Sequence, residues 1–162
     1  YTTVSLARYV TTVANSGTCY DLTLIDQVKD VNGNVILDNH AKVRNKVNIA
    51  NSTWKAVHNG MYRVVNGSRS SIGSMFSGMK VKIAGKTGTA QQSKLHANHA
   101  YFVSYAPYKN PEISVTCVIP NGFTSSNAAQ TARDVYKYYF SKNKKKVSGK
   151  IKMPESNTTH TD

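Results

Sequence analysis

The sequence predicts an α+β fold, in which helices pack on an antiparallel sheet. Apolar residues recur at helical spacing in three separate stretches, and short alternating runs typical of strands lie between them. The last two of these runs, at 100–106 and 113–119, are separated by a short turn that contains two prolines, which makes them antiparallel neighbours. Helices that precede and follow such strands along the chain indicate a sheet that is covered by helices.

The first 40 residues predict a helix followed by strands. Residues 4–14 carry Leu6, Val10, Val13 and Ala14 on one stripe, with Thr2 or Thr3 as a possible N-cap and Gly17 as a stop. Residues 20–24 then alternate between apolar and polar residues, as a strand does. Asn32-Gly33 lies between two apolar runs and predicts a hairpin, whereas residues 41–50 are too mixed to assign.

The rest of the chain predicts two more helices around a three-stranded meander. Ser52 can cap a helix that ends at Asn66-Gly67, and residues 68–79 are rich in Ser and Gly, as in a loop. Strands are expected within 81–90, 100–106 and 113–119. Asn127, with Gln130 three residues later, resembles a capping box and predicts the start of a third helix.

The charge is strongly positive. Lys and Arg number 21 and Asp and Glu 8, which gives +13 with histidine neutral and favours anionic surroundings. Six lysines lie in residues 142–162, whose composition predicts a basic flexible tail after a folded part at 1–141. Because no array of arginines and aromatic residues suited to base stacking is found, nucleic acid is not an expected partner.

Candidates for metal or disulfide chemistry are weak. His96 and His99 lie three residues apart, but zinc needs three or four ligands and neither cysteine is near them in sequence. We therefore expect no metal and no other cofactor. Cys19 and Cys117 do not define a disulfide. The acidic residues form no close pair, so a two-carboxylate glycosidase is unsupported.

One stretch, residues 83–91 (IAGKTGTAQ), carries the clearest chemistry. In a strand, Lys86 and Gly88 point to one side while Thr87 and Thr89 point to the other. Because Gly88 has no side chain, a ligand can lie close to the backbone there. The lysine ammonium and threonine hydroxyls suit a carboxylate, and a free backbone N–H beside the glycine suits a developing oxyanion.

Lys-Thr-Gly is also the third motif of penicillin-binding proteins and class A β-lactamases. Around it, the chain resembles the C-terminal part of the transpeptidase domain of class B penicillin-binding proteins. Residues 4–18 look like that family's helix before an NGG-like turn, and 59–65 (NGMYRVV) like its GM..VV helix. Residues 86–91 are similar to its KTGTAQ, and 99–107 (HAYFVSYAP) to its HAWFVGYAP. The resemblance runs in order from about residue 3 to 140.

The resemblance implies part of a penicillin-binding or β-lactamase-like transpeptidase fold and the reaction of a peptidoglycan D,D-transpeptidase. Such enzymes cross-link peptidoglycan stem peptides, and β-lactam antibiotics acylate their serine. By position, Lys86, Thr87 and Thr89 would bind the carboxylate of substrate or drug. Gly88 would allow close approach, the Thr89 N–H would supply half of the oxyanion hole, and Gln91 would line the cleft.

The nucleophile that the family needs is missing from its expected place, upstream of Lys-Thr-Gly. Three segments fit Ser-x-x-Lys, beginning at Ser52, Ser77 and Ser141, and two fit Ser-x-Asn, beginning at Ser125 and Ser141. Their positions or their order disagree with the family's pattern, and such short patterns often match by chance. We therefore expect this chain to supply one wall of the site and to be inactive alone.

The chain opens at Tyr1 without a leader, which suggests a piece of a longer protein. The resemblance implies that this parent is anchored in the bacterial plasma membrane and works on its extracytoplasmic face. The chain itself has no run of about 18 apolar residues and is expected to be soluble. Two alternatives remain: a β-lactam sensor or β-lactamase-type domain, and a non-catalytic module that binds polyanions.

Overall fold

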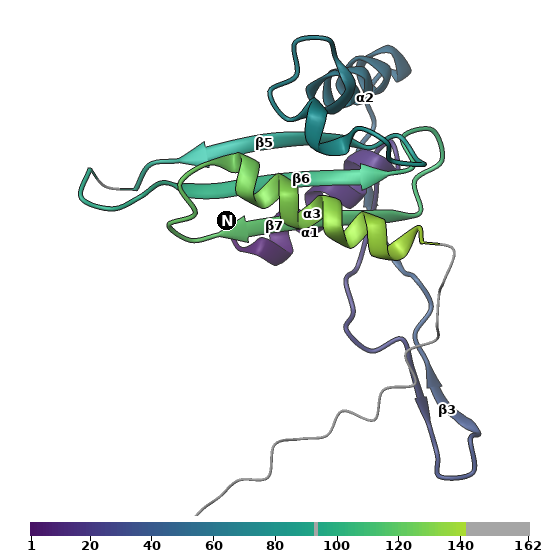
Figure 1. Ribbon diagram of the computed structural model, residues 1–162. Coiled ribbons are helices and arrows are strands. Elements are labelled where there is room, and N and C mark those ends of the chain that lie inside the picture. Colours follow the sequence, from purple (N-terminus) through teal and green to yellow (C-terminus); the bar gives the residue numbers. More distant parts are fainter. Residues whose placement is uncertain (93, 142–162) are drawn as a thin grey trace, which may run out of the picture.

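The computed structural model describes residues 1–92 and 94–141. Its main sheet has the strand order β5-β6-β7 and is antiparallel throughout, so the predicted meander is confirmed (Figure 1). Two short two-stranded sheets, β1-β4 and β2-β3, precede it in sequence. In chain order the elements are α1 (Thr3–Ala14), β1 (Thr18–Tyr20), β2 (Gln27–Lys29), β3 (Val35–Asp38), β4 (Val43–Lys46), α2 (Asn51–Asn66), the 3₁₀ helix η1 (Gly73–Phe76), β5 (Ala84–Ala90), β6 (His99–Ala106), β7 (Ile113–Ile119) and α3 (Ser125–Tyr139).

The three helices occur where the apolar stripes predicted them, but two of the predicted caps are wrong. Thr2 does cap α1, since its Oγ1 accepts the Ser5 N–H at 3.2 Å. Helix α2 begins at Asn51 after Ala50, so Ser52 lies inside the first turn and not at the cap. Helix α3 begins earlier than predicted, and Thr124 caps it. The Asn127 amide donates to the Gly122 carbonyl instead, at 2.9 Å.

The strands before α2 depart further from prediction. The hairpin around Asn32-Gly33 is confirmed as β2-β3, which extends away from the main sheet (Figure 1). The strand predicted over 20–24 is wrong beyond Tyr20, where β1 ends. β1 pairs instead with β4, from the segment that sequence patterns left unassigned. The predicted loop at 68–79 also contains η1.

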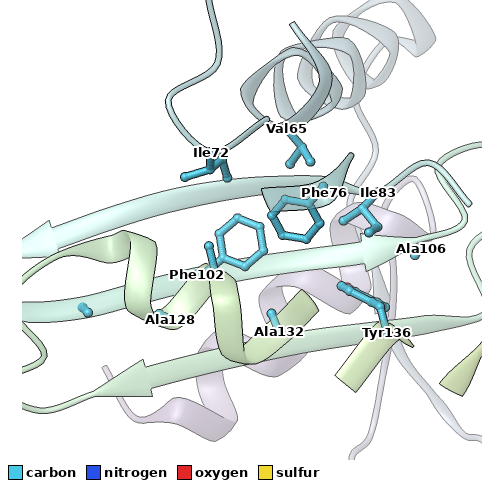
Figure 2. Packing of buried hydrophobic residues seen from close by; sticks show 11 residues of the cluster. Val65, Ile72, Phe76, Ile83, Phe102, Ala106, Ala128, Ala132 and Tyr136 are labelled. Carbon is cyan, nitrogen blue, oxygen red and sulfur yellow. The ribbon is translucent and has the colours of Figure 1, made fainter. Parts of the chain in front are cut away.

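Helices cover both faces of the main sheet. On one face, Phe102 of β6 packs with the alanines of α3, with Phe76 of η1 and with Val65 of α2 (Figure 2). On the other face, Val10 and Val13 of α1 pack against Tyr105 of β6 and Ala84 of β5, together with Trp54 and Met61 of α2. Alternate residues of β6 therefore belong to the cores on opposite faces of the sheet. The buried faces of α1 and α3 pack against the sheet from these two sides.

This arrangement leaves β5 at the edge of the main sheet, next to α2. Asn66 at the end of α2 ties the helix to the start of β5, because its amide donates to the Ile83 carbonyl at 2.8 Å. Within residues 1–92 and 94–141, no helix combines the length and apolar character needed to cross a bilayer. The tail predicted at 142–162 lies outside the described residues.

Candidate functional site

The stretch with the predicted chemistry forms the edge strand β5, with its side chains alternating as predicted. Lys86 lies opposite Val103 of β6, and Gly88 lies opposite Tyr101. These four residues line a shallow hollow of about 320 Å³, to which Leu6 of α1 also contributes. The hollow, called here the Lys86 hollow, therefore lies on the face of the sheet that α1 covers.

The Lys86 ammonium is exposed and retains bonding capacity. Its Nζ donates to the carbonyl oxygen of Thr87 at 2.7 Å, which uses one of the three ammonium hydrogens. The other two are available to a ligand in the hollow. None of the ion pairs among the described residues involves Lys86, so its positive charge is free to meet an incoming anion.

The two glycines of the strand have different environments. A Cβ on Gly88 would lie 3.3 Å from the Cβ of Tyr101, which is tight but compatible with a small shift. A Cβ on Gly85 would lie 2.5 Å from Cζ of Phe102, inside the core. Gly85 is therefore required by packing, whereas Gly88 leaves the outer part of β5 without a side chain beside Lys86. The requirement at Gly85 escaped sequence reasoning because it depends on the partner strand.

Thr89 and Gln91 lie at the far end of the strand. Thr89 is exposed and pairs with Ala100, and β5 ends one residue later at Ala90. Gln91 is exposed immediately beyond the strand. The five predicted site residues thus follow one another along a single exposed edge, with Lys86 and Gly88 on the face opposite Thr87 and Thr89.

His99 joins this end of β5 to the turn before α3, a role that sequence reasoning missed. The backbone N–H of Asn121 donates to His99 Nδ1 at 2.9 Å, and His99 Nε2 lies 2.8 Å from the side-chain oxygen of Gln92. Because Nδ1 accepts a hydrogen bond, Nε2 carries the proton that binds Gln92. Among the described residues, no group of three His, Cys, Asp or Glu side chains is placed to hold a metal.

The candidate serines lie away from the Lys86 hollow. The described residues that line the hollow include no serine. Ser52 is exposed in the first turn of α2, and Ser77 follows η1. Ser125 begins α3, and Ser141 follows its end, while Lys142 to Lys144 fall outside the described residues.

The cysteines do not supply a nucleophile either. Both thiols are free, with Cys19 buried and Cys117 half-buried on β7. Burial raises the pKa of Cys117, so the unreactive protonated thiol dominates at neutral pH. The described residues of β5 include neither a serine nor a cysteine.

Comparisons with known proteins match most of the chain. The family model for the penicillin-binding protein transpeptidase domain matches residues 1–137. Penicillin-binding protein 2B of Streptococcus pneumoniae is 34% identical over 151 residues, which cover 86% of this chain and 22% of that protein. Peptidoglycan D,D-transpeptidase MrdA of Haemophilus influenzae is 40% identical over 103 residues, which cover 54% of this chain and 16% of that protein.

Solved structures agree with these sequence matches. Penicillin-binding protein 2B from S. pneumoniae strain R6 superposes with a TM-score of 0.76 at 32% identity, over 88% of this chain and 26% of that chain. The imipenem acyl-enzyme of penicillin-binding protein A from Mycobacterium tuberculosis has the same fold, with a TM-score of 0.73 at 22% identity over 85% of this chain and 30% of that chain. The chain thus belongs to the penicillin-binding protein transpeptidase family.

Proposed function

We propose that this chain forms the Lys-Thr-Gly wall of a serine D,D-transpeptidase that cross-links peptidoglycan stem peptides. The observation that carries the proposal is the exposed edge of β5, where Lys86 faces an open hollow and Gly88 leaves space beside it. An ammonium with free hydrogens and two threonines along one edge suit a peptide that ends in a carboxylate. Family membership supports the same assignment.

In the proposed reaction, Lys86, Thr87 and Thr89 hold the terminal carboxylate of a D-alanyl-D-alanine donor. A serine oxygen bonds to the carbonyl carbon between the two alanines, while the Thr89 N–H stabilises the negative charge on the carbonyl oxygen. The C–N bond breaks, and the serine proton passes to the departing D-alanine. An acceptor amine then displaces the serine oxygen and returns a proton to it. Gln91 lines the cleft on the donor side.

We also propose that the serine belongs to a longer protein that contains this chain. The chain spans only 22% and 16% of the two relatives described above, and the described lining of the Lys86 hollow has no serine. A longer protein of this kind would be anchored in the plasma membrane and act on its outer face. The same serine would be acylated by β-lactams, as the mycobacterial protein is by imipenem.

The role of Lys86 can be tested in that longer protein. Lys86→Ala should slow acylation by penicillin by about 10- to 100-fold, because a charge-assisted hydrogen bond to the drug's carboxylate is lost. Lys94→Ala is the matched control, since Lys94 is an exposed lysine beyond the end of β5. The rate is read from the covalent adduct by mass spectrometry. Equal rates for Lys86→Ala and the unmodified protein would contradict the proposed role.

A further inference from the structure

A second groove, of about 770 Å³, opens beside β5. It lies between the end of α2, the loop that follows the helix, and the strand. Arg63 and Arg69 supply positive charge to it, and Ser68 and Ser71 supply hydroxyls. Thr87 of β5 lines both this groove and the Lys86 hollow. Thr87 of the Lys-Thr-Gly motif therefore belongs to the lining of both spaces, and we call the second one the arginine groove.

The arginine groove lies in a stretch of sequence that has no acidic residue. Residues 39–111 contain eleven Lys and Arg residues and no Asp or Glu. Both arginines are exposed, and in the described part of the chain neither belongs to an ion pair. A guanidinium presents a planar fork of N–H donors that matches the two oxygens of a carboxylate. The donors of the arginine groove thus suit a carboxylate.

Among the serine hydroxyls near the arginines, one is hydrogen-bonded within the loop and two are available to a ligand. Ser70 is used by the loop, because its Oγ donates to the Val64 carbonyl at 2.6 Å and accepts the Ile72 N–H at 3.3 Å. Ser68 and Ser71 are exposed and make no hydrogen bond to another described residue through their hydroxyls. The loop is therefore held in place by Ser70 while its neighbours face the solvent.

The order of groups along β5 assigns the arginine groove to one side of the reaction. In the proposed function, the scissile carbonyl lies at Thr89 and the departing D-alanine lies toward Lys86 and Thr87. The donor peptide therefore extends the other way, past Gln91. The arginine groove begins at Thr87, on the leaving-group side. An acceptor amine must approach from that side, because it takes the place that the departing alanine vacates.

We propose that the arginine groove binds a carboxylate of the acceptor peptide and so directs the acceptor amine to the acyl-enzyme. This inference rests on the proposed function and deepens it. The acceptor is favoured over an anionic wall polymer as the occupant because the groove shares Thr87 of the Lys-Thr-Gly motif with the Lys86 hollow. Arg63 and Arg69 are positioning residues in this scheme, since they hold the acceptor and do not touch the bond that breaks.

The test uses the longer transpeptidase and a D-alanyl-D-alanine donor peptide. The acyl-enzyme reacts either with water or with an added amine. The ratio of aminolysis to hydrolysis products therefore measures acceptor binding. Two acceptor peptides are compared, identical except that one carries a carboxylate and the other its carboxamide. The carboxylate acceptor should give a ratio about five- to tenfold higher, a preference that the double variant Arg63→Gln/Arg69→Gln should remove.

Three controls separate the possible outcomes. Lys137→Gln on α3 removes one exposed charge away from the arginine groove and should keep the preference. Arg69→Lys keeps the positive charge but lacks the planar fork of N–H donors, and it should keep part of the preference for the carboxylate acceptor. Penicillin acylation should be the same in all variants. A preference that survives in the double variant would overturn the proposal. Absence of penicillin acylation in the unmodified protein would instead overturn the proposed function beneath it.

Discussion

Two buried tyrosines differ in whether their hydroxyl has a hydrogen-bond partner. The Tyr136 hydroxyl donates to Ser104 Oγ at 2.9 Å, whereas the Tyr105 hydroxyl is buried without a partner among the described residues. Desolvation by burial, with a smaller contribution from Tyr108, raises the pKa of Tyr105 to about 12, so this hydroxyl stays neutral at ordinary pH. An unpartnered buried hydroxyl costs free energy that a phenyl ring does not.

We therefore expect opposite results from the same substitution. Tyr136→Phe should lower the free energy of unfolding by about 1 kcal/mol, because it removes the bond to Ser104. Tyr105→Phe should leave the stability unchanged or raise it slightly. Urea unfolding of both variants measures the difference. A larger loss in Tyr105→Phe than in Tyr136→Phe would show that the hydroxyl of Tyr105 has an important partner.

Gly85 should not tolerate a side chain. The methyl group of Gly85→Ala would be forced against Phe102 at 2.5 Å, and overpacking of this kind costs about 1–3 kcal/mol. Gly60→Ala in α2 is the matched control, because a Cβ there meets nothing within 4 Å. The control should gain about 0.5–1 kcal/mol from helix propensity. Thermal unfolding distinguishes the two, and equal melting temperatures would contradict this packing.

At the level of residues, part of the site could be predicted from the sequence. The alternation of Lys86 and Thr87 follows from the period of a strand, and the structure confirms it. The need for glycine at Gly85 and the bond between His99 and Asn121 could not be predicted. Each depends on a residue that the fold brings near from 17 or 22 positions away. The functional roles of the five site residues remain predictions.

Among the elements, helix bodies were predictable and their ends were not. Apolar stripes define the buried face of each helix over several turns, so one misplaced residue changes little. A cap depends on which of several nearby polar side chains accepts a hydrogen bond from a free backbone N–H of the first turn. Near α3, Thr124 occupies the cap while Asn127 binds Gly122. The pairing of β1 with β4 escaped prediction because both strands are short and lie far apart in sequence.

The β2-β3 hairpin depends on the ionised form of Asp30. Its carboxylate accepts the Asn34 side-chain amide and backbone N–H, both at 2.8 Å, and the Asn32 N–H at 2.9 Å. These bonds, the Asn34 side chain first, lower the pKa of Asp30 below its usual 3.8. The stabilisation is therefore present above about pH 4 and is lost as the pH falls through the lowered pKa.

Lowering the pH from about 5 to 2 should accordingly loosen this hairpin before acid affects the main sheet. A fall in the protection of the Asn32 and Asn34 amides, measured by NMR as exchange relative to the intrinsic rate at each pH, reports the change. Asp30→Ala should show low protection at both pH values, because its turn has no carboxylate to lose. Protection of these amides that stayed the same from pH 5 to pH 2 in the unmodified chain would contradict the assignment.

Across the whole molecule, helices cover the main sheet while large apolar side chains remain exposed elsewhere. On the β2-β3 hairpin, Ile36 is 68% exposed and Val31 is fully exposed. Leu24, just before the hairpin, is also fully exposed. Exposed apolar groups in such numbers favour association with other surfaces.

This chain alone is therefore expected to self-associate or to be of low stability. Sedimentation should show a mean mass that rises with concentration, and Leu24→Thr with Ile36→Thr should reduce that rise because less apolar area is available for burial. Val10→Thr would be unsuitable as a test, since Val10 is in the core. A monomer with a cooperative melt at every concentration would contradict this expectation.

The central claim is that this chain forms one wall of a transpeptidase site whose serine lies outside it. The most direct test is the intact mass of the chain after incubation with excess penicillin, beside a longer protein that includes it. The account predicts no adduct on this chain and one penicillin on the longer protein. An adduct on this chain that disappeared when Ser52 or Ser77 was replaced would contradict it, because the nucleophile would then lie within the chain.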